Sequence, residues 1–160
     1  MASLGVLTSS DLGSRGLRED ISGRRIQELL PPPEFTLRRY EVVPDERETI
    51  ADRLRRWSDE DGLDLIVSTG GTGLTSRDVT PEATLEVVDR LVPGMAEAMR
   101  AVGMRSTPLA MLSRGVVGVR GRTLIVNLPG SPKAVEENLK AILPVLPHAL
   151  ETLRDKPHKT

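Results

Sequence analysis

The sequence predicts an α/β fold, a three-layer sandwich in which helices flank a mainly parallel sheet. Short apolar runs alternate along the chain with longer segments of helical periodicity, which is the order of elements that builds parallel sheets. The runs are continuous instead of alternating with polar residues, as in strands that are buried on both faces. Three of these runs are residues 4–7, 65–67 and 123–128.

The predicted elements of the first half are a strand over 4–7, a helix over 20–30, a strand over 35–43 and a helix that opens at Pro44. Three consecutive prolines at 31–33 end the first helix, because proline cannot continue a helix. The second helix opens with Asp45, and Glu48 follows three residues later. This spacing is typical of a capping box, with aspartate in place of serine or threonine.

The predicted elements of the second half are a strand over 65–67, a helix over 81–91, a short helix over 95–102, a strand over 123–128 and a final helix from 132. Thr80 is expected to cap the first of these helices, which then begins with a proline. Residues 111–121 mix apolar, basic and glycine residues and are compatible with a short strand or with a hairpin. Pro144 and Pro147 are expected to kink or split the final helix.

Composition narrows the possible classes of function. A chain of 160 residues with 28% charged residues predicts one globular domain over 1–155, followed by a loose tail over 156–160. A net charge of -1 and one residue each of Phe, Trp and Tyr favour no nucleic-acid partner. Cysteine is absent, which excludes disulfides and thiolate metal sites. Without a long apolar run or a secretory signal, we expect no membrane span and a cytoplasmic location.

Polar or glycine-rich segments follow three of the predicted strands, and an aspartate follows the fourth. The segments are residues 8–11, 68–73 and 129–131, and the aspartate is Asp45. Because ligands of parallel α/β sheets bind beyond the carboxyl ends of the strands, we expect these segments to share one cleft.

The segment 68–73 carries three glycines and predicts a phosphate site. Glycines let a ligand approach the backbone closely and leave N–H groups free to bind an anion. A P-loop is excluded because its lysine is missing, and a dinucleotide fingerprint is excluded because Ser76 stands in place of its third glycine. A tight turn without a ligand remains the alternative. Ser131 is expected to cap the final helix and to contribute to an anion site there.

Three charged residues near this loop have open roles. With Thr80 as the helix cap, the carboxylate of Asp78 is expected to be free. A carboxylate beside phosphate oxygens needs a bridging cation, so Asp78 indicates Mg²⁺. The capping box explains Asp45 without any function, and a functional role is the alternative. Arg77 either offsets phosphate charge or is simply solvated.

Three longer stretches, VSTGGTGLTSRDVTPEAT, MLSRGVVGVRG and LIVNLPGSPKAVEENL, resemble the MoaB/Mog family of molybdenum cofactor biosynthesis, which is related to the G domain of gephyrin. The similarity runs from the first strand to the last helix. It implies the MoaB/Mog-like fold and a nucleotidyltransferase that transfers AMP from Mg-ATP to the terminal phosphate of molybdopterin, with release of pyrophosphate. It also implies a homotrimer and a hand-over of the product to a molybdenum insertase.

The resemblance also implies the site residues. Asp45 and Asp78 match the two catalytically important aspartates of the family, and Mg²⁺ is expected at them, directly or through water. The residues expected to bind the nucleotide or molybdopterin are Thr8, Ser9, Asp11, Ser68, Gly70, Gly71, Thr72, Gly73, Ser113, Pro129, Gly130 and Ser131. The alternatives are a non-catalytic molybdopterin-binding or scaffold module, and a metal-insertion role like that of a related domain in longer proteins.

Overall fold

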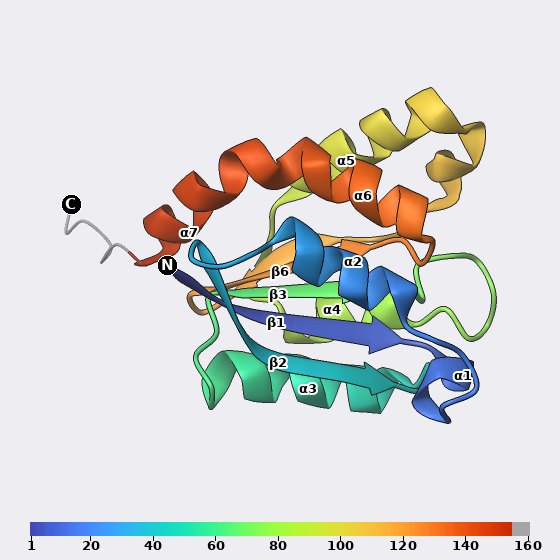
Figure 1. Ribbon diagram of the computed structural model, residues 1–160, viewed down its shortest axis with the longest axis horizontal. Coiled ribbons are helices and arrows are strands. Elements are labelled where there is room, and N and C mark those ends of the chain that lie inside the picture. The colour runs from blue at the N-terminus through green and yellow to red at the C-terminus, as the bar shows by residue number, and fades with distance from the viewer. Residues whose placement is uncertain (155–160) are drawn as a thin grey trace.

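The computed structural model describes residues 1–154, which form a six-stranded sheet in the order β2-β1-β3-β6-β5-β4 (Figure 1). The strands are β1 (Ala2–Ser9), β2 (Phe35–Val43), β3 (Leu65–Thr69), β4 (Arg90–Leu91), β5 (Val117–Arg120) and β6 (Thr123–Leu128). Strands β2, β1, β3 and β6 pair in parallel, whereas β5 and β4 are antiparallel to their neighbours. The mainly parallel sheet is confirmed. The predicted tail over 156–160 lies outside the described residues.

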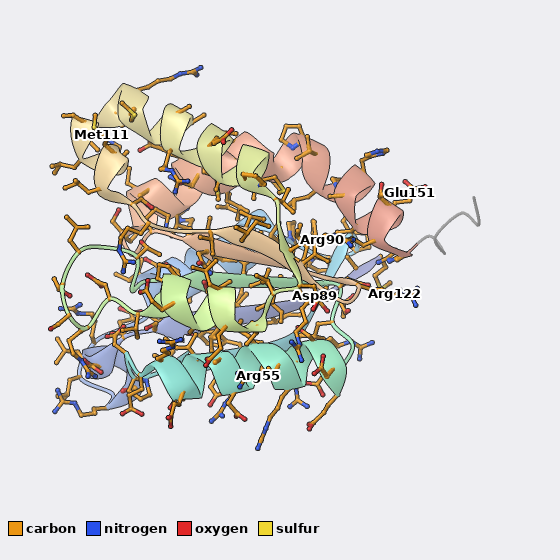
Figure 2. All side chains as sticks on the ribbon, turned by 180° about the vertical axis from the view of Figure 1, so that it is seen from behind. Arg55, Asp89, Arg90, Met111, Arg122 and Glu151 are labelled. Carbon is orange, nitrogen blue, oxygen red and sulfur yellow. The ribbon has the colours of Figure 1, made fainter. Side chains whose placement is uncertain are left out.

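Helices cover both faces of the sheet, which confirms the three layers. They are α1 (Asp11–Ser14), α2 (Ile21–Leu29), α3 (Arg47–Asp59), α4 (Thr80–Val87), α5 (Pro93–Ser106), η1 (Pro108–Leu112), α6 (Pro132–Ile142), η2 (Leu143–Val145) and α7 (Leu146–Arg154). Figure 1 shows α2, α5, α6 and α7 on one face of the sheet and α3 and α4 on the other. Figure 2 shows the same layers from behind, with Arg55 on α3 and Met111 at the end of the opposite layer.

The central strands send alternate side chains into two cores. Leu65 and Val67 of β3 pack under α2, α5, α6 and α7, while Ile66 packs under α3 and α4. The neighbouring β6 follows the same pattern, with Leu124 in the first core and Ile125 in the second. Because both faces of these strands are covered, their middle segments, residues 65–67 and 124–126, are apolar on both faces.

Two predicted helices have other bounds in the structure. The helix predicted over 81–91 ends earlier, with α4, because the residues that follow form the edge strand β4. The N–H of Asp89 donates to the carbonyl of Val119 at 2.7 Å, so pairing with the sheet replaces the last helical hydrogen bonds. The helix predicted over 95–102 is longer at both ends. Its first residue is Pro93, which is tolerated in the first turn because a helix needs no N–H there.

Both N-caps predicted beside the glycine loop are wrong, whereas Ser131 caps α6 as predicted. Helix α3 has no side-chain cap, so Asp45 and Glu48 form no capping box. Helix α4 has none either, because Thr80 is already its first helical residue. At α3, local spacing assigns Asp45 to the cap, but its carboxylate binds residues that are distant in the sequence.

The two uncertain regions of the second half are resolved. Residues 111–121 contain the end of η1 and then β5, which forms a hairpin with β6. The hairpin turns at Gly121, which has a φ of +58°. Pro144 and Pro147 do split the final helix, since η2 separates α6 from α7.

The register of the parallel strands places their carboxyl ends side by side. Ser9 is paired with Val43, Thr8 with Thr69, and Thr69 with Leu128. The segments that leave β1, β2, β3 and β6 therefore start at one edge of the sheet.

Candidate functional site

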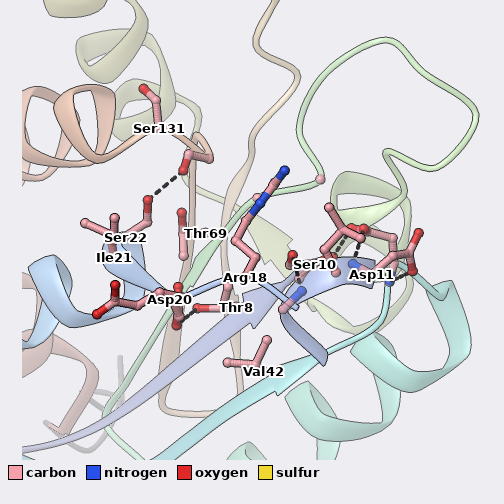
Figure 3. A pocket seen from close by; sticks show the side chains of 18 of the residues that line it. Thr8, Ser10, Asp11, Arg18, Asp20, Ile21, Ser22, Val42, Thr69 and Ser131 are labelled. Carbon is pink, nitrogen blue, oxygen red and sulfur yellow. Dashed lines mark hydrogen bonds between the residues drawn. The ribbon is translucent and has the colours of Figure 1, made fainter. Parts of the chain in front are cut away.

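A cleft of about 650 Å³ opens at this edge of the sheet, and we call it the strand-end cleft (Figure 3). The predicted site residues that line it are Thr8, Ser9, Asp11, Asp45, Gly70, Gly71, Asp78, Gly130 and Ser131. All four segments expected at one cleft thus meet there.

A second pocket, of about 350 Å³, lies beside the strand-end cleft, between the loops and helices α5, η1 and α6. Thr72, Gly73, Ser113 and Pro129 line this second pocket and do not line the cleft. Ser131 lines both cavities. The predicted binding residues are therefore divided between two cavities that share a wall.

Ser68 lines neither cavity and is buried below them. Its Oγ accepts a hydrogen bond from the side chain of Asn127 at 3.0 Å. The same amide donates to Thr84 of α4 at 3.0 Å and accepts from the N–H of Val116 at 3.1 Å. Ser68 thus belongs to a buried network that joins β3, β6 and α4 beneath the glycine loop.

In the glycine loop, residues 70–73, the backbone at Gly70 and Gly71 fits only glycine. Gly70 has a φ of +91° and Gly71 a φ of +69°, and a Cβ on either would come within 3.0 Å of a neighbouring oxygen. The N–H of Gly70 donates to the carbonyl of Leu128 at 3.2 Å. The N–H groups of residues 71–73 donate to no acceptor within residues 1–154. This arrangement presents three N–H groups, of the kind that bind phosphate oxygens.

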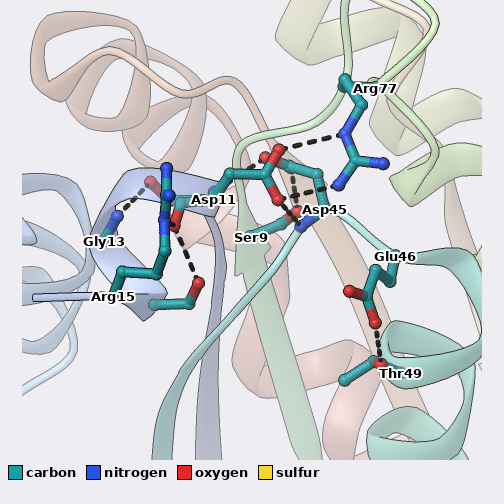
Figure 4. A network of polar contacts seen from close by, with 10 residues as sticks. Ser9, Asp11, Gly13, Arg15, Asp45, Glu46, Thr49 and Arg77 are labelled. Carbon is teal, nitrogen blue, oxygen red and sulfur yellow. Dashed lines mark hydrogen bonds and ion pairs between the residues drawn. The ribbon is translucent and has the colours of Figure 1, made fainter.

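The loop after β1 holds the carboxylate of Asp45 (Figure 4). Asp45 accepts hydrogen bonds from the Ser9 hydroxyl and from the N–H of Asp11, the latter at 3.0 Å. In return, its own N–H donates to Asp11 at 2.9 Å. These contacts explain why Asp45 does not cap α3.

Arg77 is engaged by Asp11 through two parallel hydrogen bonds, of 3.0 and 2.9 Å. The Arg77 guanidinium, followed by the N–H of Asp45, lowers the pKa of Asp11 below its ordinary value. Arg77 is therefore not simply solvated, and its charge is already paired with a carboxylate of the protein. This pair ties the loop of Asp78 to the end of β1.

Asp78 is only partly free, contrary to the expectation based on Thr80 as the cap. One of its carboxylate oxygens accepts from the N–H and from the hydroxyl of Thr75, each at 2.9 Å. The other carboxylate oxygen accepts no hydrogen bond from the part of the chain that the structure describes. That oxygen belongs to a residue that lines the strand-end cleft.

Arg114 orients this region, although the sequence reasoning did not single it out. Its guanidinium donates to the carbonyl of Gly73 at 2.8 Å and to that of Asp78 at 2.8 Å. It also forms an ion pair with Glu82 of α4 at 2.6 Å, which lowers the pKa of Glu82. The available signal was its place in the stretch MLSRG, next to Ser113.

Asp20 was also missed, although it lines the strand-end cleft. One oxygen of its carboxylate accepts from the hydroxyls of Thr8 at 2.7 Å and of Tyr40 at 2.5 Å. The other caps α2 by accepting from the N–H of Gly23 at 3.0 Å. Its position at the start of the helix predicted over 20–30, after a polar loop, was the signal that could have found it.

Comparisons with known proteins match this chain over nearly its whole length. Residues 5–148 fit the family described as "Probable molybdopterin binding domain". A molybdopterin adenylyltransferase from Helicobacter pylori is 45% identical over 155 residues, which cover 94% of this chain and 86% of that protein. Gephyrin from Dictyostelium discoideum is 42% identical over 96% of this chain, which corresponds to 23% of gephyrin.

A solved structure extends the similarity to three dimensions. The molybdopterin biosynthesis enzyme MoaB from Thermus thermophilus is 58% identical, with a TM-score of 0.92. The match covers 99% of this chain and 100% of that chain. It therefore includes the elements that build both cavities.

Proposed function

Because the chain belongs to the family described as "Probable molybdopterin binding domain", we propose that it is a molybdopterin adenylyltransferase of molybdenum cofactor biosynthesis. The enzyme transfers AMP from ATP to the terminal phosphate of molybdopterin and releases pyrophosphate. The observation that carries this proposal is the 45% identity to the Helicobacter pylori molybdopterin adenylyltransferase, over most of both chains. Residues 1–155 act as one domain in this proposal.

The two cavities suit a reaction that joins two substrates. The strand-end cleft and the second pocket share Ser131 and meet along the glycine loop. A transferred group has to lie within reach of both substrates at once, so we place it at this shared wall. The free N–H groups of residues 71–73 are available there, and so is the N-terminus of α6 behind Ser131.

The chemistry requires no general base. The attacking oxygen belongs to a phosphate that is already ionised at neutral pH, so catalysis depends on positioning and on stabilisation of charge. The described lining of the strand-end cleft contains hydroxyls, carboxylates, one arginine and loop glycines, and no histidine. These groups match such a reaction.

Magnesium fits the carboxylates of this cleft. No group of three His, Cys, Asp or Glu side chains within residues 1–154 could by itself hold a metal ion. Mg²⁺ is commonly held by one or two carboxylates together with substrate phosphates and water. The free oxygen of Asp78, and Asp45 of the same cleft lining, would supply these carboxylates. The ion, when bound, would neutralise charge on the phosphates.

The family resemblance extends the proposal to assembly and location. We include a cytoplasmic homotrimer that passes adenylylated molybdopterin to a molybdenum insertase. No helix among residues 1–154 is long and apolar enough to cross a membrane. Sedimentation of the purified protein would measure its oligomeric state directly.

Release of pyrophosphate tests the activity. The purified protein should release pyrophosphate from Mg-ATP when molybdopterin is added, and none when molybdopterin is omitted. A scaffold or binding module of the same family would bind molybdopterin and release no pyrophosphate. Binding without release would therefore replace the enzyme by that alternative.

Asp78→Asn tests the role of the carboxylate. The amide oxygen of asparagine can still accept the hydrogen bonds of Thr75, so the variant should fold and melt as the wild type does. It should lose AMP transfer because it lacks the negative oxygen for the cation. Asp52→Asn, on the outer side of α3, removes the same charge away from both cavities and should retain activity. Full activity of Asp78→Asn would contradict the metal-binding role.

A further inference from the structure

The strand-end cleft carries an excess of negative charge. Its described lining contains five carboxylates, those of Asp11, Glu19, Asp20, Asp45 and Asp78. The same lining contains one basic side chain, that of Arg18. Both proposed substrates are polyanions, which such a cleft repels unless cations compensate.

The other arginines of the site are engaged by protein carboxylates. Arg77 binds Asp11, and Arg114 binds Glu82. The sequence neighbour of Arg18, Glu19, is paired with Arg24. Within residues 1–154, no hydrogen bond and no ion pair holds Arg18.

Arg18 is exposed and belongs to the loop between α1 and α2. Figure 3 shows its side chain reaching across the cleft, between the side of Ser22 and Ser131 and the side of Ser10 and Asp11. The guanidinium therefore stands over the space that a ligand would fill, with its donors unused by the described chain. A planar guanidinium binds two phosphate oxygens at once, which a lysine ammonium cannot do with the same geometry.

We propose that Arg18 pairs with the phosphate oxygens of a phosphorylated substrate in the strand-end cleft and so positions that substrate for the reaction. This inference rests on the proposed function. The partner is a phosphate or polyphosphate group, and both ATP and molybdopterin carry one. Arg18 is then a substrate contact that the sequence motifs do not include, since it lies outside all three of the quoted stretches.

The test compares Arg18→Ala and Arg18→Lys with Arg38→Ala as the matched control. Arg38 is an exposed arginine on β2 without a described ion pair, and it lines neither cavity. Each alanine variant thus loses one exposed positive charge. Pyrophosphate release is measured against ATP at saturating molybdopterin, and against molybdopterin at saturating ATP.

Arg18→Ala should raise the KM of one substrate about tenfold, the lower range for a charge-assisted hydrogen bond at an exposed site. The substrate whose KM rises is the one that Arg18 contacts. Arg18→Lys should recover part of the loss, and the salt dependence of that KM should weaken in Arg18→Ala because one ionic contact is missing. Arg38→Ala should match the wild type. Melting temperatures of all variants should be equal, since no described contact within the protein is lost.

A second measurement separates this inference from the proposed function. Calorimetry with inorganic tripolyphosphate and Mg²⁺ should show about tenfold weaker binding to Arg18→Ala than to the wild type and Arg38→Ala. If the wild type releases no pyrophosphate but shows this difference, the proposed function fails and the phosphate contact of Arg18 stands. If Arg18→Ala equals Arg38→Ala in both kinetics and binding, or if the wild type neither reacts nor binds tripolyphosphate, the role of Arg18 is overturned.

Discussion

Replacing Gly70 with alanine should force apart the end of β1 and the glycine loop. Gly70 has a φ of +91°, and a Cβ there would lie within 3.0 Å of the carbonyl oxygen of Ser9. Both atoms are fixed to the backbone, so no side-chain rotation can relieve the contact. The β1 and β3 strands would have to shift relative to one another at the place where the cleft begins.

The expected loss of stability has two parts. A non-glycine residue at positive φ costs about 1–2 kcal/mol. Moving a backbone segment out of a close contact adds strain of about 1–3 kcal/mol. Together they predict that Gly70→Ala lowers the free energy of unfolding by about 3 kcal/mol.

Gly62→Ala separates the two parts. Gly62 has a φ of +60°, but a Cβ there would meet no atom within 4 Å. This control should cost about 1 kcal/mol, the cost of positive φ alone. Both variants restrict the unfolded chain equally, so that effect cancels in the comparison.

Urea denaturation followed by the fluorescence of Trp57 measures both variants, and pyrophosphate release measures their activity. Trp57 is the single tryptophan of the chain and is buried under the sheet. Gly70→Ala should also lose AMP transfer at temperatures where it remains folded, whereas Gly62→Ala should keep it. Differences below about 0.5 kcal/mol are within the additivity error for independent sites. If the free energies of unfolding of the two variants differ by less than this, the close contact at Gly70 adds no strain to the loop.

Two further predictions concern the buried amide and the single tyrosine. Asn127→Ala should lower the free energy of unfolding by about 2–4 kcal/mol, because it leaves buried groups without partners. The control Asn138→Ala loses one hydrogen bond within its own helix and should cost about 1 kcal/mol. Equal costs of the two variants in urea denaturation would contradict the role of the Asn127 network. Burial, and then the hydrogen bond to Asp20, raises the pKa of Tyr40 from 10.0 to about 12. The stability gained from neutral Tyr40 is therefore complete below pH 10.0 and is lost as the pH rises through about 12. The ultraviolet absorbance of phenolate should titrate near that value and nearer to 10.0 in Asp20→Asn; a wild-type midpoint at 10.0 would refute the assignment.

The predictions that the structure confirms are those that depend on burial and on the order of elements along the chain. The continuous apolar run at 65–67 is a central strand because helices cover both of its faces. The strand-end segments meet because parallel strands place their carboxyl ends at one edge. For the same reason the cleft could be predicted from sequence, although its volume and its second neighbouring pocket could not.

Two of the errors share one physical origin, which is competition from distant partners. Asp45 has the spacing of a cap, but Ser9 and Asp11, more than thirty positions away, bind its carboxylate. The helix predicted to 91 stops early because β5 offers backbone partners to Asp89. Local spacing describes what a residue can reach along the chain, and it carries no information on what the folded chain brings beside it.

Residue types and their order were enough to predict the α/β class and the family. They were not enough to predict which charges remain available in the cleft, because that depends on the folded arrangement. Arg77 lies 66 positions from Asp11 and is neutralised by it, while Asp78 keeps one oxygen free. Arg18 lines the cleft and has no described partner. Ion pairing is settled by distance in space, and that distance exists only once the chain has folded.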